Sequence, residues 1–345
     1  MPQKVKLAIS GLGLVGVRHV AAASRLSDVE VVAVVDPGNA AKVEAARMNL
    51  AVFDTLDDLF EAQVIDGLII ATPTPLHATH AHVAIERGCP VLIEKPIATK
   101  ASEAKGFVEL AETKGVPVLI GHHRRHNPLI QAAKTAIEDG LLGEIRAVQA
   151  LCWFYKPDTY FDAAPWRKHP GAGPISVNLV HDVDLLRYLC GDVHSLVANS
   201  APSRRGYENE ELATALLTFE SGALGSLSVS DAVVSPWSWE MTAKEYPIYP
   251  VTDQSCYQIG GTRGALSIPD LTLWRHEGEP DWWQPMRQEA LAYEEADPLI
   301  RQLAHFRDVI LGQDQPLVSG REGLKSLQVI EAIASSAKTG SRERL

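Results

Sequence analysis

Three glycines near the start of the chain have the spacing of a phosphate-binding turn. Gly11, Gly13 and Gly16 form a GxGxxG run between an apolar, β-branched segment and a helical pattern. In that context Gly11 permits a tight turn, Gly13 lets the backbone approach a pyrophosphate, and Gly16 permits close helix–strand packing. The start of the helix, at Leu14 and Val15, supplies free N–H groups and a positive dipole for the phosphate charge. The run therefore predicts a dinucleotide site.

A carboxylate follows at the end of the next predicted strand. Asp36 lies 20 residues after Gly16, where its oxygens can accept hydrogen bonds from the adenosine ribose hydroxyls. It would repel a 2′-phosphate, and the following residues 37–39 include no Arg or Lys to hold one. The sequence therefore predicts NAD as the cofactor and disfavours NADP.

A lysine stands in an unusual place for a structural residue. Lys95 follows the apolar run Val91–Ile93, so its ammonium is expected at the carboxyl edge of the sheet, where a nicotinamide should lie. Partial burial near a positively charged ring would depress the pKa of Lys95, which a proton-transferring lysine needs. An ordinary ion pair, for example with Glu94, is the alternative.

A second loop is expected at the same edge of the sheet. Thr72 and Pro73 end the fourth predicted strand, so this loop should pass along the cofactor, although its prolines also suit a stiff turn. His77, His80 and His82 follow on a helix with a spacing that resembles metal ligands. No acidic or Cys partner accompanies them, so we predict surface or capping roles and no metal.

Aromatic residues are distributed unevenly. All seven tryptophans lie after residue 150, which indicates one part for a cofactor and another for a ligand that aromatic faces recognise. Tyr155, Trp166 and Arg167 could offer aromatic faces and polar groups to a polyhydroxylated ring, with packing in a core or interface as the alternative. Arg124 could meet a substrate carboxylate or form an ion pair at a domain junction.

The elements that must position these residues change in character along the chain. Strand and helix patterns alternate over the first third, beginning with Val5–Ser10, which predicts parallel strands with right-handed crossovers. Strands at hairpin spacing follow later, as in Ala213–Phe219 and Ala223–Asp231. We therefore expect an α/β Rossmann domain, with a parallel doubly wound sheet, over residues 1–121. An α+β domain for substrate binding and oligomerisation, with a largely antiparallel open sheet, is expected over residues 122–345.

Composition limits the classes of partner. The chain has 345 residues, a net charge of −11 and 46% hydrophobic residues, as is ordinary for a globular protein. The acidic surplus argues against nucleic acid or a membrane surface as the main partner. No run reaches the ~18 apolar residues of a membrane span. Four scattered cysteines favour a reducing cytoplasm, and the N-terminal stretch that imitates a signal peptide is interrupted by glycines and by Arg18-His19.

In these motifs the sequence resembles the glucose–fructose oxidoreductase / inositol dehydrogenase (Gfo/Idh/MocA) family. The matching elements cover nearly the whole chain in order: the GxGxxG with His19, Thr72-Pro73 with His77, Glu94-Lys95-Pro96, Gly121–Arg125, Trp166-Arg167 and Gly171–Asp184. The motif around Lys95, behind a glycine fingerprint, is the most specific. The resemblance implies that the cofactor-binding residues include Thr72, Pro73, His77, Glu94 and Lys95.

The resemblance also assigns the chemistry. In this family a lysine of that motif and a histidine on a later helix flank the substrate hydroxyl, and they correspond here to Lys95 and His181. Asn178 precedes His181 by three residues, so both side chains project from one helix face. Family members often carry an aspartate four residues before the histidine, where Val177 stands here. Asn178 can hydrogen-bond a hydroxyl but holds no charge, which puts the usual acid–histidine relay in question.

The function implied is oxidation of a secondary hydroxyl of a sugar, sugar acid or cyclitol, as in inositol dehydrogenases, by hydride transfer to NAD. One alternative is an NAD-retaining, glycoside-cleaving enzyme of the same fold. Another is a non-catalytic, NAD-sensing regulator, against which the retention of Lys95 and His181 argues. In relatives the open face of the second sheet mediates oligomers, so a homodimer or homotetramer is expected.

Overall fold

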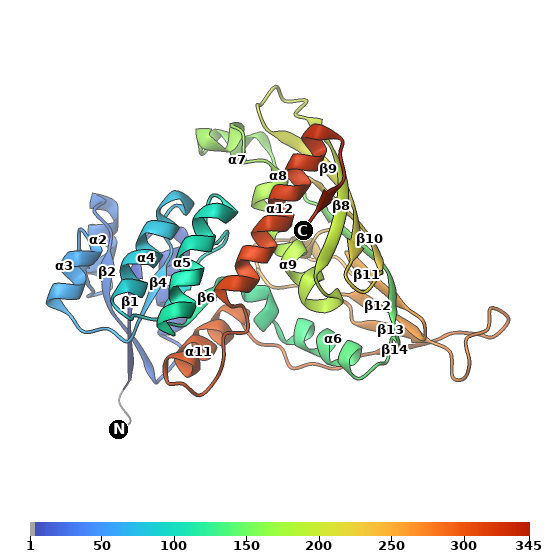
Figure 1. Ribbon diagram of the computed structural model, residues 1–345, viewed down its shortest axis with the longest axis horizontal. Helices are drawn as coiled ribbons and strands as arrows, with labels where there is room; N and C mark the ends of the chain where they lie inside the picture. Colours follow the sequence, from blue (N-terminus) through green and yellow to red (C-terminus); the bar gives the residue numbers. More distant parts are fainter. Residues whose placement is uncertain (1–3) are drawn as a thin grey trace. The chain divides into compact units, whose positions relative to one another are not determined.

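The computed structural model describes residues 4–345, which form two compact units (Figure 1). The first unit contains residues 4–127 and Ala296–Leu327, and the second contains Pro128–Glu295 and Gln328–Leu345. The expected boundary between residues 121 and 122 lies close to the first crossing between the units. That boundary does not include the later return of the chain to the first unit.

The sheet of the first unit has six parallel strands in the order β3-β2-β1-β4-β5-β6. Their bounds are β1 (Val5–Ser10), β2 (Val29–Val35), β3 (Ala51–Phe53), β4 (Gly67–Ile70), β5 (Val91–Ile93) and β6 (Val118–Ile120). The expected parallel, doubly wound sheet is confirmed. In register, Ser10 aligns with Ile70 and Ile70 with Ile93. The carboxyl ends of β1, β4 and β5 therefore meet at one edge.

Helices alternate with these strands. They are α1 (Leu14–Ala23), α2 (Asn39–Arg47), α3 (Leu56–Ala62), α4 (His77–Glu86) and α5 (Ala101–Lys114). Local signals explain several of their ends. At the start of α3, Thr55 accepts a hydrogen bond from the backbone N–H of Asp58 at 3.2 Å. Gly115, in the left-handed conformation, ends α5.

Helix α11 (Pro298–Ile310) explains why the chain returns to the first unit. Its Leu303 and Phe306 are buried in the same core as Ile9 of β1. A Cβ at Gly67 of β4 would lie 3.0 Å from the ring of Phe306, so the strand needs a glycine where this helix crosses it. The apolar face of α11 thus completes the cover of the parallel sheet.

The second unit contains a nine-stranded sheet in the order β14-β13-β12-β11-β7-β10-β9-β8-β15. Its strands are β7 (Ile145–Trp153), β8 (Val193–Pro202), β9 (Glu210–Phe219), β10 (Leu224–Ser230), β11 (Tyr257–Gly261), β12 (Gly264–Ile268), β13 (Thr272–Arg275), β14 (Arg287–Ala290) and β15 (Glu343–Arg344). Only β7 and β10 pair in parallel; the other neighbours are antiparallel. The expected largely antiparallel sheet is confirmed.

Helices cover one face of this sheet (Figure 1). These helices are α6 (Pro128–Glu138), α8 (Pro174–Val177), α9 (Leu179–Cys190), α10 (Trp239–Thr242) and α12 (Gly320–Thr339), whose residues from 328 on belong to this unit. The short helix α7 (Asp158–Asp162) contributes no residue to the buried core that they form with the sheet. On β7 the buried Val148, Ala150 and Cys152 alternate with Gln149 and Leu151, as expected for a sheet with one covered face. Within residues 4–345, no helix is both long and apolar enough to cross a bilayer.

Candidate active site

The glycine turn has the geometry that its spacing predicts. Gly11 has a φ of +91°, and a Cβ there would lie 2.7 Å from the carbonyl oxygen of Ala71. A Cβ at Gly16 would lie 2.1 Å from the carbonyl oxygen of Gly11. A Cβ at Gly13 would meet no described atom within 4 Å. Packing therefore requires the first and third glycines, whereas the second leaves the backbone open for a ligand to approach.

Asp36 is joined directly to the glycine turn. One of its carboxylate oxygens accepts a hydrogen bond from the backbone N–H of Leu12 at 2.9 Å, and the other accepts one from that of Gly38 at 2.9 Å. Each carboxylate oxygen can accept a further hydrogen bond. Asp36 is thus fixed at the end of β2, in the position expected for a residue that binds a ribose.

The loop after β4 offers a polar atom to a ligand. The N–H of Thr72 lies 2.7 Å from where a Cβ of Gly11 would be, so the two backbones are in contact. Among the described residues, the buried hydroxyl of Thr72 has no hydrogen-bond partner. At the adjacent helix start, Leu14 is 79% exposed. A hydroxyl without a partner in a loop that contacts the glycine turn, together with an unburied helix N-terminus, fits a bound dinucleotide.

Glu94 contacts both the turn that carries Lys95 and helix α1. One Glu94 carboxylate oxygen lies 2.8 Å from Nε2 of His19, on α1, and the other accepts a hydrogen bond from the backbone N–H of Lys95 at 3.2 Å. His19 is fully buried. A Cβ at Gly121 would lie 3.0 Å from the Glu94 carboxylate, so the end of β6 must be a glycine to leave room for it.

Glu94 is ionised at neutral pH. Burial raises the pKa of its carboxyl, but the hydrogen bond and charge of His19 outweigh this effect, together with the charges of His123 and Lys95. The net result is a pKa of about 2. The negative charge of the Glu94 carboxylate therefore lies next to the backbone N–H of Lys95.

His77 lies between the two loops. Its Nδ1 is 2.9 Å from the carbonyl oxygen of Pro96, its Nε2 is 2.9 Å from that of Thr72, and the residue is 1% exposed. Both ring nitrogens are therefore occupied by backbone groups. Of the other two histidines of this helix, His80 contacts the hydroxyl of Ser10 at 2.7 Å, and His82 is exposed.

In the second unit, Asn178 and His181 lie at the start of α9. Asn178 occupies the position before the helix, and its carbonyl oxygen accepts a hydrogen bond from the N–H of His181 at 3.1 Å. His181 is 8% exposed, and Val177 ends the preceding short helix α8. This part of the unit thus presents an amide and an imidazole one helical turn apart.

Lys156 is a residue of this region that sequence reasoning does not find. Its ammonium donates a hydrogen bond of 2.6 Å to the side-chain oxygen of Asn178 and lies 5.0 Å from the ring centre of Tyr160. The side chain is buried, and burial lowers the pKa of Lys156, an effect that the nearby Asp231 carboxylate offsets only in part. Lys156 stands between Tyr155 and Pro157 without any motif, so its sequence context carries no signal.

Carboxylates surround the same region. Burial raises the pKa of Asp231, whose carboxylate lies 3.4 Å from Arg205. Burial also raises the pKa of Glu210, which accepts a hydrogen bond from the N–H of Ile175 at 3.0 Å. A Cβ at Gly173 would lie 2.2 Å from that carboxylate, which explains a glycine just before α8.

The predicted substrate residues have different environments. Tyr155 and Trp166 are exposed, at 45% and 57%. Arg167 donates a hydrogen bond of 2.6 Å to the carbonyl oxygen of Tyr160, and its guanidinium lies 4.0 Å from the ring centre of the same residue. Arg124, in the first unit, is buried in the single turn after β6. The sequence therefore identifies two accessible aromatic side chains, one arginine that is hydrogen-bonded to the backbone, and one buried arginine.

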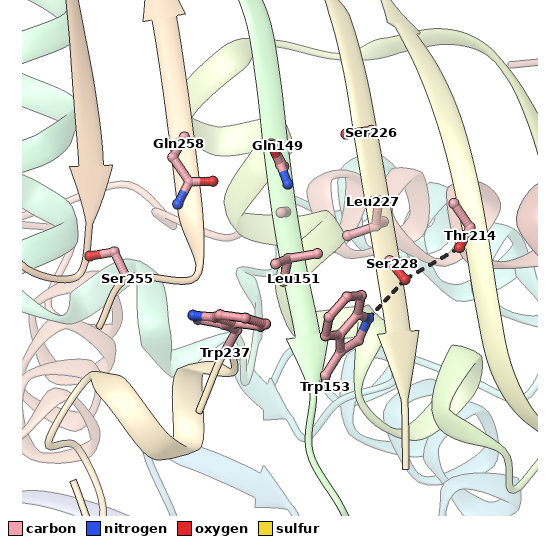
Figure 2. Close-up of a pocket in the computed structure, with 11 residues that line it drawn as sticks. Gln149, Leu151, Trp153, Thr214, Ser226, Leu227, Ser228, Trp237, Ser255 and Gln258 are labelled. Atoms are coloured by element: carbon pink, nitrogen blue, oxygen red, sulfur yellow. Dashed lines mark hydrogen bonds between the residues drawn. The ribbon is translucent and has the colours of Figure 1, made fainter. Parts of the chain in front are cut away.

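A separate hollow of about 610 Å³ lies on the outward face of the second sheet, over β7, β9, β10 and β11 (Figure 2). Trp153 and Trp237 meet there with ring centres 5.7 Å apart. The indole N–H of Trp153 donates a hydrogen bond to the hydroxyl of Ser228 at 2.9 Å. Polar side chains such as Gln149 and Gln258 complete the hollow, which occupies the face opposite the buried side chains of β7.

Both parts of the chain match known families. Residues 5–122 match an oxidoreductase family with an NAD-binding Rossmann fold, and residues 130–267 match the GFO/IDH/MocA C-terminal domain. The chain belongs to the GFO/IDH/MocA oxidoreductase family. The expectations of this family, of NAD as the cofactor and of a dehydrogenase acting on CH–OH groups are thereby confirmed.

Similar GFO/IDH/MocA proteins extend over the whole chain. The D-apiose dehydrogenase of Paraburkholderia graminis is 26% identical over 98% of this chain and 89% of the relative. The scyllo-inositol 2-dehydrogenase (NAD(+)) of Bacillus subtilis is 27% identical over 99% of this chain and 96% of the relative. The rhizopine catabolism protein MocA of Rhizobium meliloti is 34% identical, but that match covers 54% of this chain and 58% of the relative.

Among solved structures, the WlbA dehydrogenase from Bordetella pertussis, in complex with NADH and UDP-GlcNAcA, has a TM-score of 0.80 and 28% identity. The similarity covers 99% of both chains. This GFO/IDH/MocA chain is thus similar in fold, along nearly its whole length, to a protein that was crystallised with a dinucleotide.

Proposed function

We propose that this GFO/IDH/MocA chain oxidises a secondary hydroxyl of a sugar, sugar acid or cyclitol with NAD. The observation that carries the proposal is the position of Lys95. Its turn follows β5 at the same sheet edge as the glycine turn and the Thr72 loop, and the ionised Glu94 holds its backbone there. A lysine at the edge where a nicotinamide binds is suited to proton transfer at a substrate hydroxyl.

The cofactor site consists of Gly11, Gly13 and Gly16 with the start of α1, of Asp36, and of Thr72 and Pro73. When bound there, NAD supplies the acceptor for the hydride. The orphaned hydroxyl of Thr72 donates or accepts a hydrogen bond toward it, and Asp36 accepts from the ribose.

In this proposal Lys95 or His181 removes the proton of the substrate hydroxyl, and Asn178 hydrogen-bonds the same or a neighbouring hydroxyl. Lys156 fixes the orientation of the Asn178 amide, because its ammonium occupies the amide oxygen and leaves the NH₂ group as the donor. The amide therefore recognises a hydroxyl oxygen.

Recognition of the rest of the substrate is assigned to Tyr155, Trp166 and Arg167, with Arg124 for a carboxylate where the substrate carries one. Exposed aromatic rings suit the C–H faces of a polyhydroxylated ring. The names of relatives that act on apiose and on scyllo-inositol support this class of substrate. They do not single out one member of it.

The test is nicotinamide absorbance with purified protein, NAD or NADP, and a panel of cyclitols, aldoses, sugar acids and nucleotide sugars. We expect one class to reduce NAD, and Lys95→Ala to lower turnover by ~10³-fold with little change in NAD affinity. The exposed Lys100→Ala is the matched control and should behave as the wild type. A loss of only a few-fold in Lys95→Ala would exclude proton transfer by Lys95.

The same panel separates the alternatives. A glycoside-cleaving enzyme that retains NAD would release a leaving group from a glycoside without net reduction of added NAD. A regulator that senses NAD would bind it tightly and convert no member of the panel.

We also propose that the chain forms a homodimer or homotetramer through the outward face of its second sheet. The hollow with Trp153 and Trp237, and the 63% exposed Leu216 of β9, lie on that face. Sedimentation of the purified protein measures the mass directly, and a monomer would exclude the proposal. The four cysteines are all buried free thiols, which supports the proposal of a reducing, cytoplasmic location.

A further inference from the structure

His77 connects the two loops that meet the cofactor and the lysine. Its ring is placed between the carbonyl oxygen of Thr72, after β4, and that of Pro96, after β5, at 2.9 Å from each. The direct alignment of Ile70 with Ile93 brings the two strand ends together, and the imidazole bridges the chain segments just beyond them.

A histidine between two carbonyls has an unusual hydrogen-bonding problem. A neutral imidazole carries one N–H and can donate to only one of the two oxygens, whereas an imidazolium can donate to both. Burial lowers the pKa of His77, although its bonds to Thr72 and Pro96 and the charge of Glu94 act in the opposite direction. In either tautomer the neutral ring donates its one N–H to one loop, while its other nitrogen lies 2.9 Å from the carbonyl oxygen of the other loop, so a single buried side chain contacts both.

A second contact braces the same turn from the other side. His19, on the helix of the glycine turn, contacts Glu94, which accepts from the backbone of Lys95. Glu94 thus connects the Lys95 turn to α1, the helix of the glycine turn. His77 connects the same turn, at the carbonyl of Pro96, to the Thr72 loop. Side chains on two different helices set its position.

We propose that His77 is a positioning residue that couples the Thr72 loop to the Lys95–Pro96 turn, so that a nucleotide held at the loop fixes the lysine. The inference rests on the proposed function only in so far as Lys95 serves the reaction. The coupling between the two loops is a property of the first unit that can be measured without turnover.

The probe for this coupling is ADP-ribose, which carries the adenosine and pyrophosphate of NAD but no nicotinamide to contact the lysine turn. Hydrogen–deuterium exchange is followed in peptides that cover residues 71–76 and 94–100. In the wild type, ADP-ribose should slow exchange in both peptides, by about threefold or more in the second. In His77→Leu, which cannot donate to either carbonyl, only the first peptide should respond.

Three further variants complete the design. His77→Gln has two N–H donors on one nitrogen and should restore the response of residues 94–100. His77→Asn keeps the donors on a shorter side chain that cannot span both carbonyls, and should behave like His77→Leu; it serves if the leucine variant does not fold. His82→Leu, exposed on the same helix, should match the wild type.

The outcomes separate this inference from the proposed function. If ADP-ribose slows exchange at residues 94–100 in His77→Leu and His77→Asn as much as in the wild type, His77 does not couple the two loops and the inference is wrong. If the coupling is present but the substrate panel is silent, the inference stands and the proposed function fails. If a substrate is found, His77→Leu should lower kcat by about tenfold or more while leaving the KM for NAD within a few-fold.

Discussion

His19 and Glu94, 75 positions apart in the sequence, bring their side chains to 2.8 Å and so connect the helix of the glycine turn to the turn of Lys95. His19 is fully buried and the Glu94 side chain is 12% exposed, and the second oxygen of Glu94 accepts a hydrogen bond from the Lys95 backbone. A contact of this kind gives the cofactor-binding helix and the proposed proton-transfer residue one common support. The electrostatic contribution of this contact to the stability of the fold can be derived from the depressed pKa of Glu94.

Glu94→Gln should destabilise the protein in a pH-dependent manner. The pKa of Glu94 is about 2 in the folded protein, against an unperturbed value of 4.5 for the unfolded chain. The ionised carboxylate therefore stabilises the fold fully above pH 4.5, and this contribution is lost as the pH falls toward 2. The difference in unfolding free energy between wild type and variant should be on the order of 3 kcal/mol at neutral pH. Urea denaturation at pH 7 and at pH 4 measures it, and the difference should narrow at pH 4.

The exposed Glu103→Gln, on α5, is the control for this prediction. It should leave the unfolding free energy unchanged at both pH values. An unfolding free energy for Glu94→Gln that differs from the wild type equally at pH 7 and pH 4 would contradict an ionic contribution of Glu94.

Gly13→Ala and Gly16→Ala should separate ligand access from packing. The added methyl group at residue 13 meets no described atom within 4 Å, so stability should change little while NAD affinity falls by about tenfold or more. At residue 16 the methyl group would lie 2.1 Å from the carbonyl oxygen of Gly11, so the protein should lose several kcal/mol of stability, roughly 3 or more. Thermal unfolding and calorimetric titration with NAD distinguish the two. An equal loss of stability in Gly13→Ala and Gly16→Ala would contradict the assignment of Gly13 to ligand access and Gly16 to packing.

Local signals explain why much of the first unit could be predicted from the sequence. The glycine spacing, Asp36 and the alternating strands and helices each depend on neighbouring residues, and the structure has the corresponding turn, carboxylate and six parallel strands. The family resemblance added Lys95 and His181, whose catalytic roles stay predictions.

Contacts between distant segments could not be predicted in the same way. Nothing around Lys156 indicates that its ammonium meets Asn178, because the contact depends on how β7 and the start of α9 are placed within the second unit. The return of α11 to the first unit is likewise a packing result, visible only in the space that Gly67 leaves for Phe306. The strands β13 and β14 are short, and β14 is exposed throughout, so their pattern carries little hydrophobic signal.

Asp36→Asn should reduce the preference for NAD. Both carboxylate oxygens accept backbone N–H groups, and an amide can accept at only one position, so the glycine turn and the ribose contact are both weakened. NAD affinity should fall by about tenfold or more, and the affinity for NADP should be unchanged or higher because the repulsion of its phosphate is removed. Calorimetric titration with both cofactors gives the ratio. The exposed Asp54→Asn should leave the ratio as in the wild type, and an unchanged ratio in Asp36→Asn would exclude the role.

Lys156→Met should make the protein more stable and less active. Because burial holds the pKa of Lys156 below 10.5, its charged form costs stability below that lowered pKa, and the cost disappears as the pH rises toward 10.5. Removal of the charge should therefore raise the unfolding free energy at pH 7. Asp231 keeps Arg205 at 3.4 Å as its partner, so no isolated carboxylate is created.

Turnover by Lys156→Met should fall by ~10- to 100-fold, because the Asn178 amide loses the ammonium that fixes its orientation. Urea denaturation and turnover of the substrate identified in the panel measure the two effects on one preparation. The exposed Lys100→Met should change neither. A variant that turns over substrate at the wild-type rate would show that Lys156 serves packing alone. A rise in stability that accompanies a fall in turnover would instead indicate that the fold carries a buried charge for the sake of the site.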